Sequence, residues 1–178
     1  MTDGSDKTSR TKIVIMKLLV LTQTVDKNDS DLGFFHRWIE LLAARAGQIL
    51  VVCLKEGKHE LPANVTVMSL GKEKGASRFN YLKKFYSIIW SKRNEYDGVF
   101  VHMNPEYVIL GGLLWRMWGK KVLFWYTHKA VNWRLRLAEK LATKIFTASK
   151  ESFRVMSRKV EVTGHGIDVG EFDRTDRT

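Results

Sequence analysis

The sequence contains very little cysteine, and this scarcity excludes whole classes of protein. A single cysteine among 178 residues cannot build a framework of disulfide bonds. That residue, Cys53, lies inside the apolar run of residues 49–54, so we expect a buried core thiol. One cysteine and five scattered histidines show no metal-ligand spacing, and we therefore expect no metal site.

Long apolar stretches are also missing. A membrane-spanning helix needs about 20 apolar residues, whereas the least charged stretch, residues 98–115, contains histidine, proline and glutamate. Residues 1–12 are polar with no apolar leader behind them, so we expect no secretory signal and a cytoplasmic protein. We expect residues 1–15 to form a disordered polar tail and residues 16–172 a single domain. Residues 173–178 would begin an interdomain linker or simply end the chain.

Several catalytic fingerprints are absent. The sequence has neither the G-x-G-x-x-G pattern of dinucleotide-binding proteins nor the P-loop lysine of nucleoside triphosphatases. It also lacks the G-x-S-x-G elbow of serine hydrolases. A phosphoacceptor receiver domain needs an aspartate at the end of a central strand, but Asp97 precedes its predicted strand.

Basic residues are abundant: 30 Lys plus Arg face 19 Asp plus Glu, which gives a formal net charge of +11. Such a chain favours polyanions, among them nucleic acid, anionic lipid and phosphorylated small molecules. One basic cluster lies on a segment with helical periodicity, beside Tyr81 and Trp90. Its members are Arg78, Lys83, Lys84, Lys92 and Arg93. We interpret it as a membrane or anion patch, with an ordinary solvated helix as the alternative.

A second basic cluster contains Arg134, Arg136, Lys140 and Lys144. It would bind a phosphate group of a ligand or simply be solvated.

Short apolar runs alternate with segments of helical periodicity along the chain. Strands are predicted at residues 17–22, with 13–15 leading in, and at 49–54, 65–70, 98–103, 122–127, 144–148 and 160–162. Helices are predicted at residues 33–46, 78–93, 107–118 and 133–143. The runs are nearly continuously apolar, as expected of parallel strands buried on both faces. We therefore predict an α/β, Rossmann-like domain with a mainly parallel sheet of about six or seven strands and helices on both faces.

Ligands of such folds bind at the carboxyl ends of the strands, so residues that follow strands are candidate site residues. Gly33 ends a polar loop after the first strand, in which Asp31 caps the helix or the glycine admits a ligand. His102 and Asn104 lie at the end of the fourth strand, where His102 is either a core residue or a ligand contact. His128 follows the fifth strand, and its imidazole can bind a hydroxyl or a phosphate.

These pieces, taken in order, resemble the family 4 retaining glycosyltransferases of GT-B fold, which include phosphatidylinositol mannosyltransferases. The resemblance is carried by residues 17–22 with the Gly33 helix entry, and by residues 96–105, 124–128 and 146–149. It ends in Gly164, His165, Gly166, Ile167 and Asp168 followed by Phe172, which is similar to the family's junction with its second domain. His165 stands where the family usually has asparagine.

The resemblance implies the amino-terminal, acceptor-binding half of a two-domain enzyme, whose other half would hold a nucleotide sugar as co-substrate. His128 matches a histidine that contacts the transferred sugar and would be the catalytic residue. Gly33, His102, Asn104 and Ser149 would contact substrate, and Gly164, His165, Gly166 and Asp168 would form the junction. No glutamate has another glutamate eight positions on, so the family's acidic motif is absent and the isolated chain should be inactive.

The acceptor implied is lipid-linked or a saccharide, with no cofactor or metal and with the enzyme peripheral on the inner face of the cell membrane. The alternative is a non-catalytic basic α/β module that binds nucleic acid or another anionic partner. No nucleic-acid-binding signature supports it, and we expect no specific nucleic acid.

Overall fold

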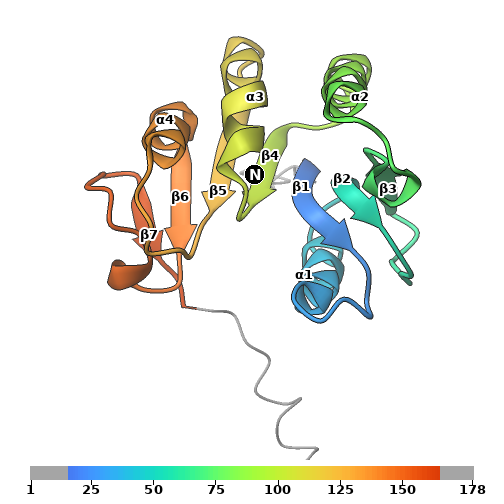
Figure 1. The fold of residues 1–178 in the computed structure, drawn as a ribbon, viewed down its shortest axis with the longest axis horizontal. Coiled ribbons are helices and arrows are strands. Elements are labelled where there is room, and N and C mark those ends of the chain that lie inside the picture. Colours follow the sequence, from blue (N-terminus) through green and yellow to red (C-terminus); the bar gives the residue numbers. More distant parts are fainter. Residues whose placement is uncertain (1–15, 165–178) are drawn as a thin grey trace, which may run out of the picture.

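The computed structural model describes residues 16–164, which form a seven-stranded, all-parallel sheet (Figure 1). The strand order is β3-β2-β1-β4-β5-β6-β7. The strands are β1 Lys17–Val25, β2 Gln48–Glu56, β3 Val65–Ser69, β4 Gly98–His102, β5 Lys121–Trp125, β6 Lys144–Thr147 and β7 Val160–Val162. The predicted α/β class, the parallel sheet and the strand number are confirmed.

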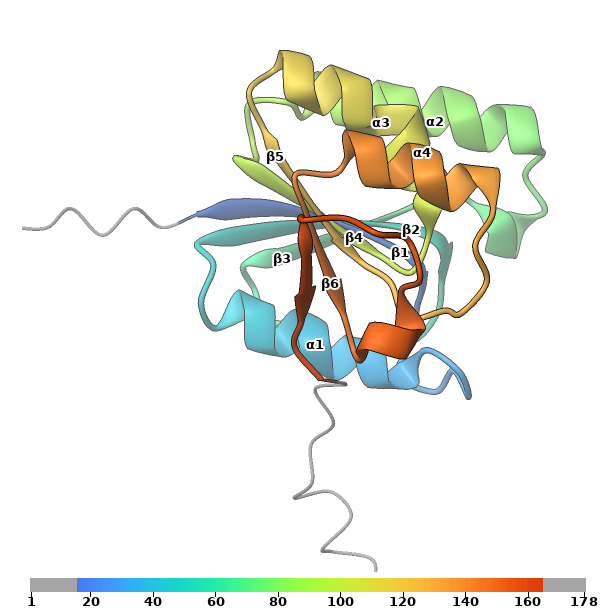
Figure 2. The same ribbon diagram turned by 90° about the vertical axis from the view of Figure 1, so that its left-hand side faces the viewer.

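Four α-helices cover the two faces of this sheet unequally. They are α1 Gly33–Ala43, α2 Arg78–Ser91, α3 Pro105–Met117 and α4 Trp133–Leu141. Helices α2, α3 and α4 lie on one face, while α1 lies on the other (Figure 2). Two short 3-10 helices, Lys72–Lys74 and Lys150–Ser152, follow β3 and β6.

Alternation of side chains along the strands produces two hydrophobic cores. Leu19 and Leu21 of β1 belong to the larger core, under α2, α3 and α4, while Leu18 and Val20 belong to the smaller core under α1. The larger core contains Trp115, whose indole nitrogen donates a hydrogen bond to the Tyr96 hydroxyl at 3.1 Å. Because central strands feed both cores, their sequences are apolar at successive positions.

Helix α2 begins as the sequence suggests but turns a different side toward the sheet. The Ser77 side chain caps it by accepting a hydrogen bond from Asn80 N. Its buried residues are Phe85, Ile88 and Ile89. The helical period places Phe79, Leu82 and Tyr86 on one face with Phe85 and Ile89, but these three side chains are exposed. In the first turn of α2 only Tyr81 packs against the larger core, and further along Ile88 rather than Tyr86 faces the sheet.

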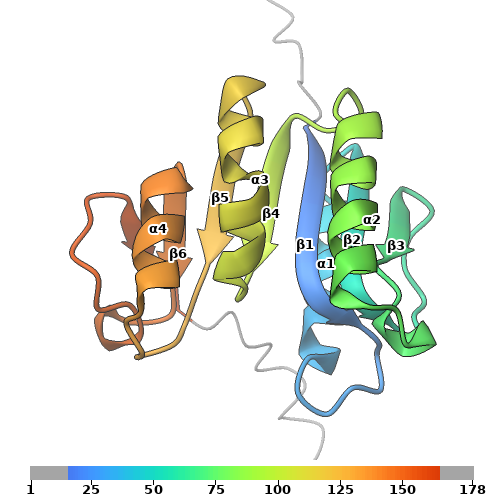
Figure 3. The same ribbon diagram turned by 45° about the horizontal axis from the view of Figure 1, so that its top comes forward.

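The strand order reverses at the centre of the sheet. From β1 the chain adds β2 and then β3 on one side, and β4 returns to pair with the other side of β1 (Figure 3). Strands β5, β6 and β7 then extend that side. In open parallel sheets this reversal creates a crevice at the carboxyl ends of the two central strands, where ligands bind.

Candidate functional site at the carboxyl ends of the strands

Four predicted site residues follow the carboxyl ends of neighbouring strands. Gly33 comes after β1, Asn104 after β4, His128 after β5 and Ser149 after β6. Since β1, β4, β5 and β6 are adjacent and parallel, these residues share one edge of the sheet, which we call the carboxyl-end rim.

The ends of β4 and β5 are tied together at this rim. The Met103 sulfur accepts hydrogen bonds from the backbone nitrogen of Thr127 at 3.4 Å and from its hydroxyl at 3.3 Å. Met103 also has a φ of 59°, a left-handed conformation that non-glycine residues rarely adopt. The hydrogen bonds from Thr127, which follows β5, therefore hold the junction between β4 and α3 in a strained conformation.

His128 is exposed on the rim. One hydrogen bond determines which ring nitrogen carries the proton when the imidazole is neutral. The Ala130 backbone N–H donates to His128 Nδ1 at 3.1 Å. Nδ1 is thus an acceptor, so a neutral ring carries its proton on Nε2. That N–H can donate a hydrogen bond to a hydroxyl or phosphate oxygen of a ligand. Tyr126, whose ring centroid lies 6.4 Å from that of His128, is buried, and desolvation raises the pKa of its phenol.

Asn104 stabilises the first turn of α3 at the rim. Its side-chain oxygen accepts a hydrogen bond from Glu106 N at 3.1 Å and caps α3, which Pro105 opens. Glu106 in turn is paired with Arg134 of α4 at 3.3 Å. The start of α3 is therefore fixed from two sides.

The loop before α1 is organised by Asp29 rather than Asp31. Asp29 Oδ1 accepts hydrogen bonds from the backbone nitrogens of Asp31 and Leu32, which lower the pKa of the Asp29 carboxyl. Leu32 is the helix-capping position and no side chain caps it, so the cap suggested for Asp31 is wrong. A Cβ on Gly33 would lie 3.1 Å from the Lys27 carbonyl oxygen, so a larger residue there would have to displace the chain's own loop by a few tenths of an ångström.

His102 lies beneath the rim, not on it. Only 1% of its surface is exposed, and its ring stacks on Phe35 of α1 with centroids 3.9 Å apart. Phe34 and Trp38 contact it edge-on at 5.9 Å each. In this conformation His102 is enclosed by these rings, which favours the core alternative, and a contact with a substrate would require Phe34, Phe35 or Trp38 to move.

Burial also fixes the charge state of His102. Desolvation lowers its pKa to about 3, so the ring is neutral in the folded protein near pH 7. Nδ1 lies 3.4 Å from the Thr22 hydroxyl, whereas Nε2 is buried and has no hydrogen-bond partner among residues 16–164. His102 is thus a core residue with one unpaired polar atom.

The remaining predicted positions divide into two groups. Ser149 is half-buried, and its hydroxyl lies 3.0 Å from that of Ser152. Gly164 has a φ of 79°, the left-handed region that glycine tolerates. His165, Gly166 and Asp168 lie outside the described residues, as do the expected tail 1–15 and residues 173–178.

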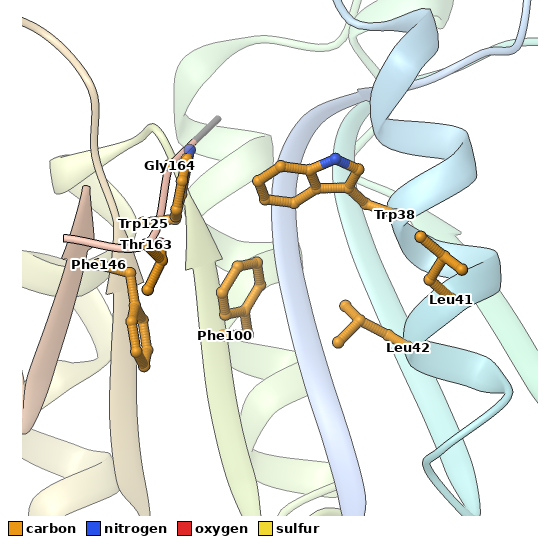
Figure 4. A pocket seen from close by; sticks show the side chains of 8 residues that line it. All are labelled: Trp38, Leu41, Leu42, Phe100, Trp125, Phe146, Thr163 and Gly164. Carbon is orange, nitrogen blue, oxygen red and sulfur yellow. The ribbon is translucent and has the colours of Figure 1, made fainter. Parts of the chain in front are cut away.

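An apolar groove opens on the α1 face of the sheet, and sequence reasoning missed it. Figure 4 shows Trp38, Leu41 and Leu42 of α1 on one side and Phe146, Thr163 and Gly164 on the other, with Phe100 between them. Trp125 completes the lining, and the cavity volume is about 310 Å³. The only signal in the sequence was the aromatic character of β4, β5 and β6, which equally suits a closed core.

A second cavity, of about 270 Å³, lies between α2 and α3 at the same end of the sheet as the rim. We call it the α2–α3 cavity. It is lined by Leu54, Leu70, Arg78, Tyr81, Leu82, Phe85, Asn104, Tyr107 and Leu110. Tyr107 is buried, and burial raises its pKa.

The basic residues on and just after α2 differ in whether they interact with other side chains. Arg78, Lys83 and Lys84 are exposed and form no ion pair within the described part of the chain. Lys92 pairs with Glu95 at 3.0 Å, and the Arg93 guanidinium lies 5.7 Å from the Trp90 ring centre. Large apolar side chains are exposed around them on α2 and α3, namely Phe79, Leu82, Tyr86, Trp90, Leu113 and Met117.

Metal and membrane features were searched over residues 16–164. No group of three or more His, Cys, Asp or Glu side chains there could hold a metal ion. Within the same range, no helix has the length and apolar character needed to cross a membrane.

Comparison with known proteins gives one family and several structures of similar fold. The sequence model of a family described as glycosyl transferase 4-like matches residues 28–150. HepE from Anabaena, solved in complex with UDP, aligns with a TM-score of 0.61 and 16% identity over 87% of this chain and 45% of that one. MurG from Acinetobacter baumannii aligns with a TM-score of 0.58 and 13% identity over 92% of this chain and 50% of that one.

An enzyme of different chemistry shares the fold. UDP-GlcNAc 2-epimerase from Methanocaldococcus jannaschii has a TM-score of 0.55 and 14% identity, over 83% of this chain and 45% of that one. The chain thus spans about half the length of these structures. No curated protein sequence matches.

Proposed function

Since the chain belongs to the glycosyl transferase 4-like family, we propose that it is the acceptor-side half of a retaining glycosyltransferase. It would bind a lipid-linked or saccharide acceptor, while a nucleotide sugar would be held by a second half that these residues do not include. The observation that carries this proposal is the carboxyl-end rim beside the strand reversal, with an exposed histidine on it.

His128 suits the task of holding the transferred sugar. With Nδ1 occupied by the Ala130 N–H, the neutral ring offers Nε2–H to an oxygen that arrives from solvent. Hydrogen bonds of this kind position a sugar ring, and they stabilise the charge that develops near the leaving group. No metal or other cofactor is needed for this role.

The rim alone gives only one wall of an active site. Glycosyl transfer needs the donor and acceptor held in one geometry, with water excluded. The rim is open, and HepE, the neighbour solved with UDP, is about twice the length of this chain. We therefore expect the 178-residue chain to bind acceptors, to bind nucleotide sugars weakly and to transfer no sugar by itself.

Helix α2 supports a peripheral position on an anionic membrane, at the inner face of the cell membrane. Arg78, Lys83 and Lys84 are exposed cations, and each is worth about 1 kcal/mol near an anionic surface. Phe79 and Trp90 are 74% and 56% exposed on the same helix and can enter the headgroup region.

Sugar transfer and acceptor binding test the proposal separately. The polypeptide that carries both halves is assayed with a set of nucleotide sugars and with lipid and saccharide acceptors, beside its His128→Ala variant. Transfer with retained anomeric configuration, lost in the variant, is the expected result. Turnover of a nucleotide sugar without any acceptor would indicate epimerase chemistry instead. Salt-sensitive DNA binding with no effect of sugars would favour a non-catalytic basic module.

A further inference from the structure

We propose that Met103 positions His128 for sugar transfer, because its sulfur holds Thr127, the residue directly before His128. This role rests on the proposed function, in which His128 contacts the transferred sugar. Met103 is a positioning residue and not a catalytic one, since it acts on the sugar only through Thr127 and His128.

The loop between β5 and α4, residues 126–132, carries His128 and has few attachments to the rest of the domain. Its first residue still pairs with β6 through a backbone hydrogen bond of 3.0 Å. Asn132, its last residue, caps α4. Apart from these, the only hydrogen bonds that join the loop to the rest of residues 16–164 are the two from Thr127 to the Met103 sulfur. The position of His128 therefore depends on the contact between Met103 and Thr127.

Met103 is itself fixed from the side of the sheet, so it can support the loop. Its backbone N–H donates to the Trp125 carbonyl oxygen at 2.8 Å, which continues the pairing of β4 with β5. Its sulfur lies 3.4 Å from the backbone nitrogen of Thr127 and 3.3 Å from its hydroxyl oxygen. The two bonds hold both the backbone and the side chain of Thr127, and the backbone of His128 follows directly.

The conformation of Met103 indicates that its side chain has a function of its own. A φ of 59° is unfavourable for a long side chain, whereas glycine adopts it without strain. Residues held in such conformations cluster at functional sites in proteins. Met103 belongs to neither hydrophobic core, so packing of the core does not account for a methionine here. The strained backbone and the contact with Thr127 together indicate a role in the site.

Backbone NMR of the 178-residue chain tests the positioning without an enzyme assay. We expect the amide order parameter of His128 in the native chain to be near that of rigid backbone, about 0.85. Met103→Leu keeps the volume of the side chain and removes the acceptor, and should lower the order parameter of His128 below about 0.6. Met117→Leu, the same change at a 73% exposed position of α3, is the matched control and should leave it unchanged.

Steady-state kinetics of the polypeptide that carries both halves test the consequence for catalysis. A catalytic contact misplaced by about 1 Å can lower the rate about 100-fold. Since Met103→Leu loosens the loop without removing His128, kcat should fall about tenfold, with KM changed less than about twofold. Loss of stability alone would not separate kcat from KM in this way, and urea unfolding of the same preparation shows that the variant is folded.

Variants of Thr127 test the same contact from the other side. Thr127→Val keeps the shape of the side chain and the backbone bond but removes the hydroxyl bond, so kcat should fall about threefold. Thr127→Ser keeps the hydroxyl and should retain more activity than Thr127→Val. An opposite order of the two variants would mean that the hydroxyl bond to the Met103 sulfur does not position His128.

An unchanged order parameter of His128 in folded Met103→Leu would overturn the positioning role, as would an equal change in Met117→Leu. If His128→Ala abolishes sugar transfer while Met103→Leu does not lower kcat, the positioning role alone is wrong. If Met103→Leu loosens the loop but the native two-half polypeptide transfers no sugar to any acceptor, the proposed function is wrong, and with it the role of Met103 in transfer.

Discussion

The two faces of the sheet are made of equally apolar strands but are covered very differently. Helices α2, α3 and α4 close one face over a continuous core that runs from Leu70 to Ile145. On the other face α1 packs over β1 and β2 and contacts the ends of β4 and β5, and it leaves β6 and β7 without an α-helix (Figure 2). The closed face accounts for most of the buried apolar surface and therefore for most of the stability. The open face presents instead the apolar groove lined by Trp38, Phe100 and Phe146.

Replacement of the largest buried side chain on the closed face should have the greatest effect. Trp115→Ala should lower the free energy of unfolding by about 3–5 kcal/mol, because it leaves a cavity and removes the hydrogen bond to Tyr96. Phe146→Ala, on the open face, is the matched comparison and should cost less than about 1.5 kcal/mol. Urea unfolding measures both. Equal losses would show that the open face is covered in solution.

Acid should weaken the protein through His102, at the edge of the α1 core. The unfolded histidine binds a proton below about pH 6.5, whereas the folded one does so only near pH 3. The stabilising contribution is thus complete above pH 6.5 and is lost as the pH falls toward 3. Between pH 6 and 4.5 the loss should be about 2 kcal/mol. His102→Phe should flatten unfolding free energy against pH in this window, and an unchanged slope would mean that His102 titrates normally.

Helix α3 should tolerate a methyl group at one glycine and not at its neighbour. A Cβ on Gly111 would lie 2.2 Å from the Trp115 ring, so Gly111→Ala should cost about 1–2 kcal/mol even after its gain in helix propensity. A Cβ on Gly112 would lie 3.0 Å from the Leu141 side chain, so the strain there is smaller and nearly balances the gain. Thermal unfolding of the two variants compares them directly. A stabilised Gly111→Ala protein would mean that the closed face is loosely packed.

His128→Ala should have the smallest effect on folding and still remove function. The side chain is exposed, so the free energy of unfolding should change by less than about 0.5 kcal/mol. In the polypeptide with both halves, kcat should fall about 100-fold or more. Steady-state kinetics and urea unfolding of the same preparation check the two parts. Unchanged kcat would remove His128 from the site, and a large loss of stability would mean that its effect is structural.

The sequence predicts the sheet well because the pattern that identifies each strand lies within the strand's own residues. Buried parallel strands such as β1 and β2 need apolar residues on both faces, and these appear as short continuous runs. The buried face of α2, in contrast, is determined by residues that are distant in the sequence. The side of α2 that meets the sheet depends on how α2 packs beside α3, so Ile88 is buried while Phe79 is exposed.

The contrast between the two strand-end histidines has the same origin. His102 ends β4, and His128 follows β5. His102 is buried because Phe35 of α1 stacks on it. Phe35 lies some 65 residues earlier in the sequence. No local pattern contains that information. The α2–α3 cavity likewise depends on residues from β2, α2, α3 and two connecting segments, and could not be predicted from any one of them.

The position of β1 also bears on how the chain is made. It precedes the other six described strands along the chain, yet it lies between β2 and β4, and its pairing with β4 begins with Leu18 and Gly98. At a synthesis rate of about 5–20 residues per second, the intervening 80 residues take roughly 4–16 s to emerge. During that interval β1 has one apolar edge with unpaired backbone groups, the feature that invites pairing with other chains. The central strand of the finished sheet is therefore an unprotected edge of the nascent one.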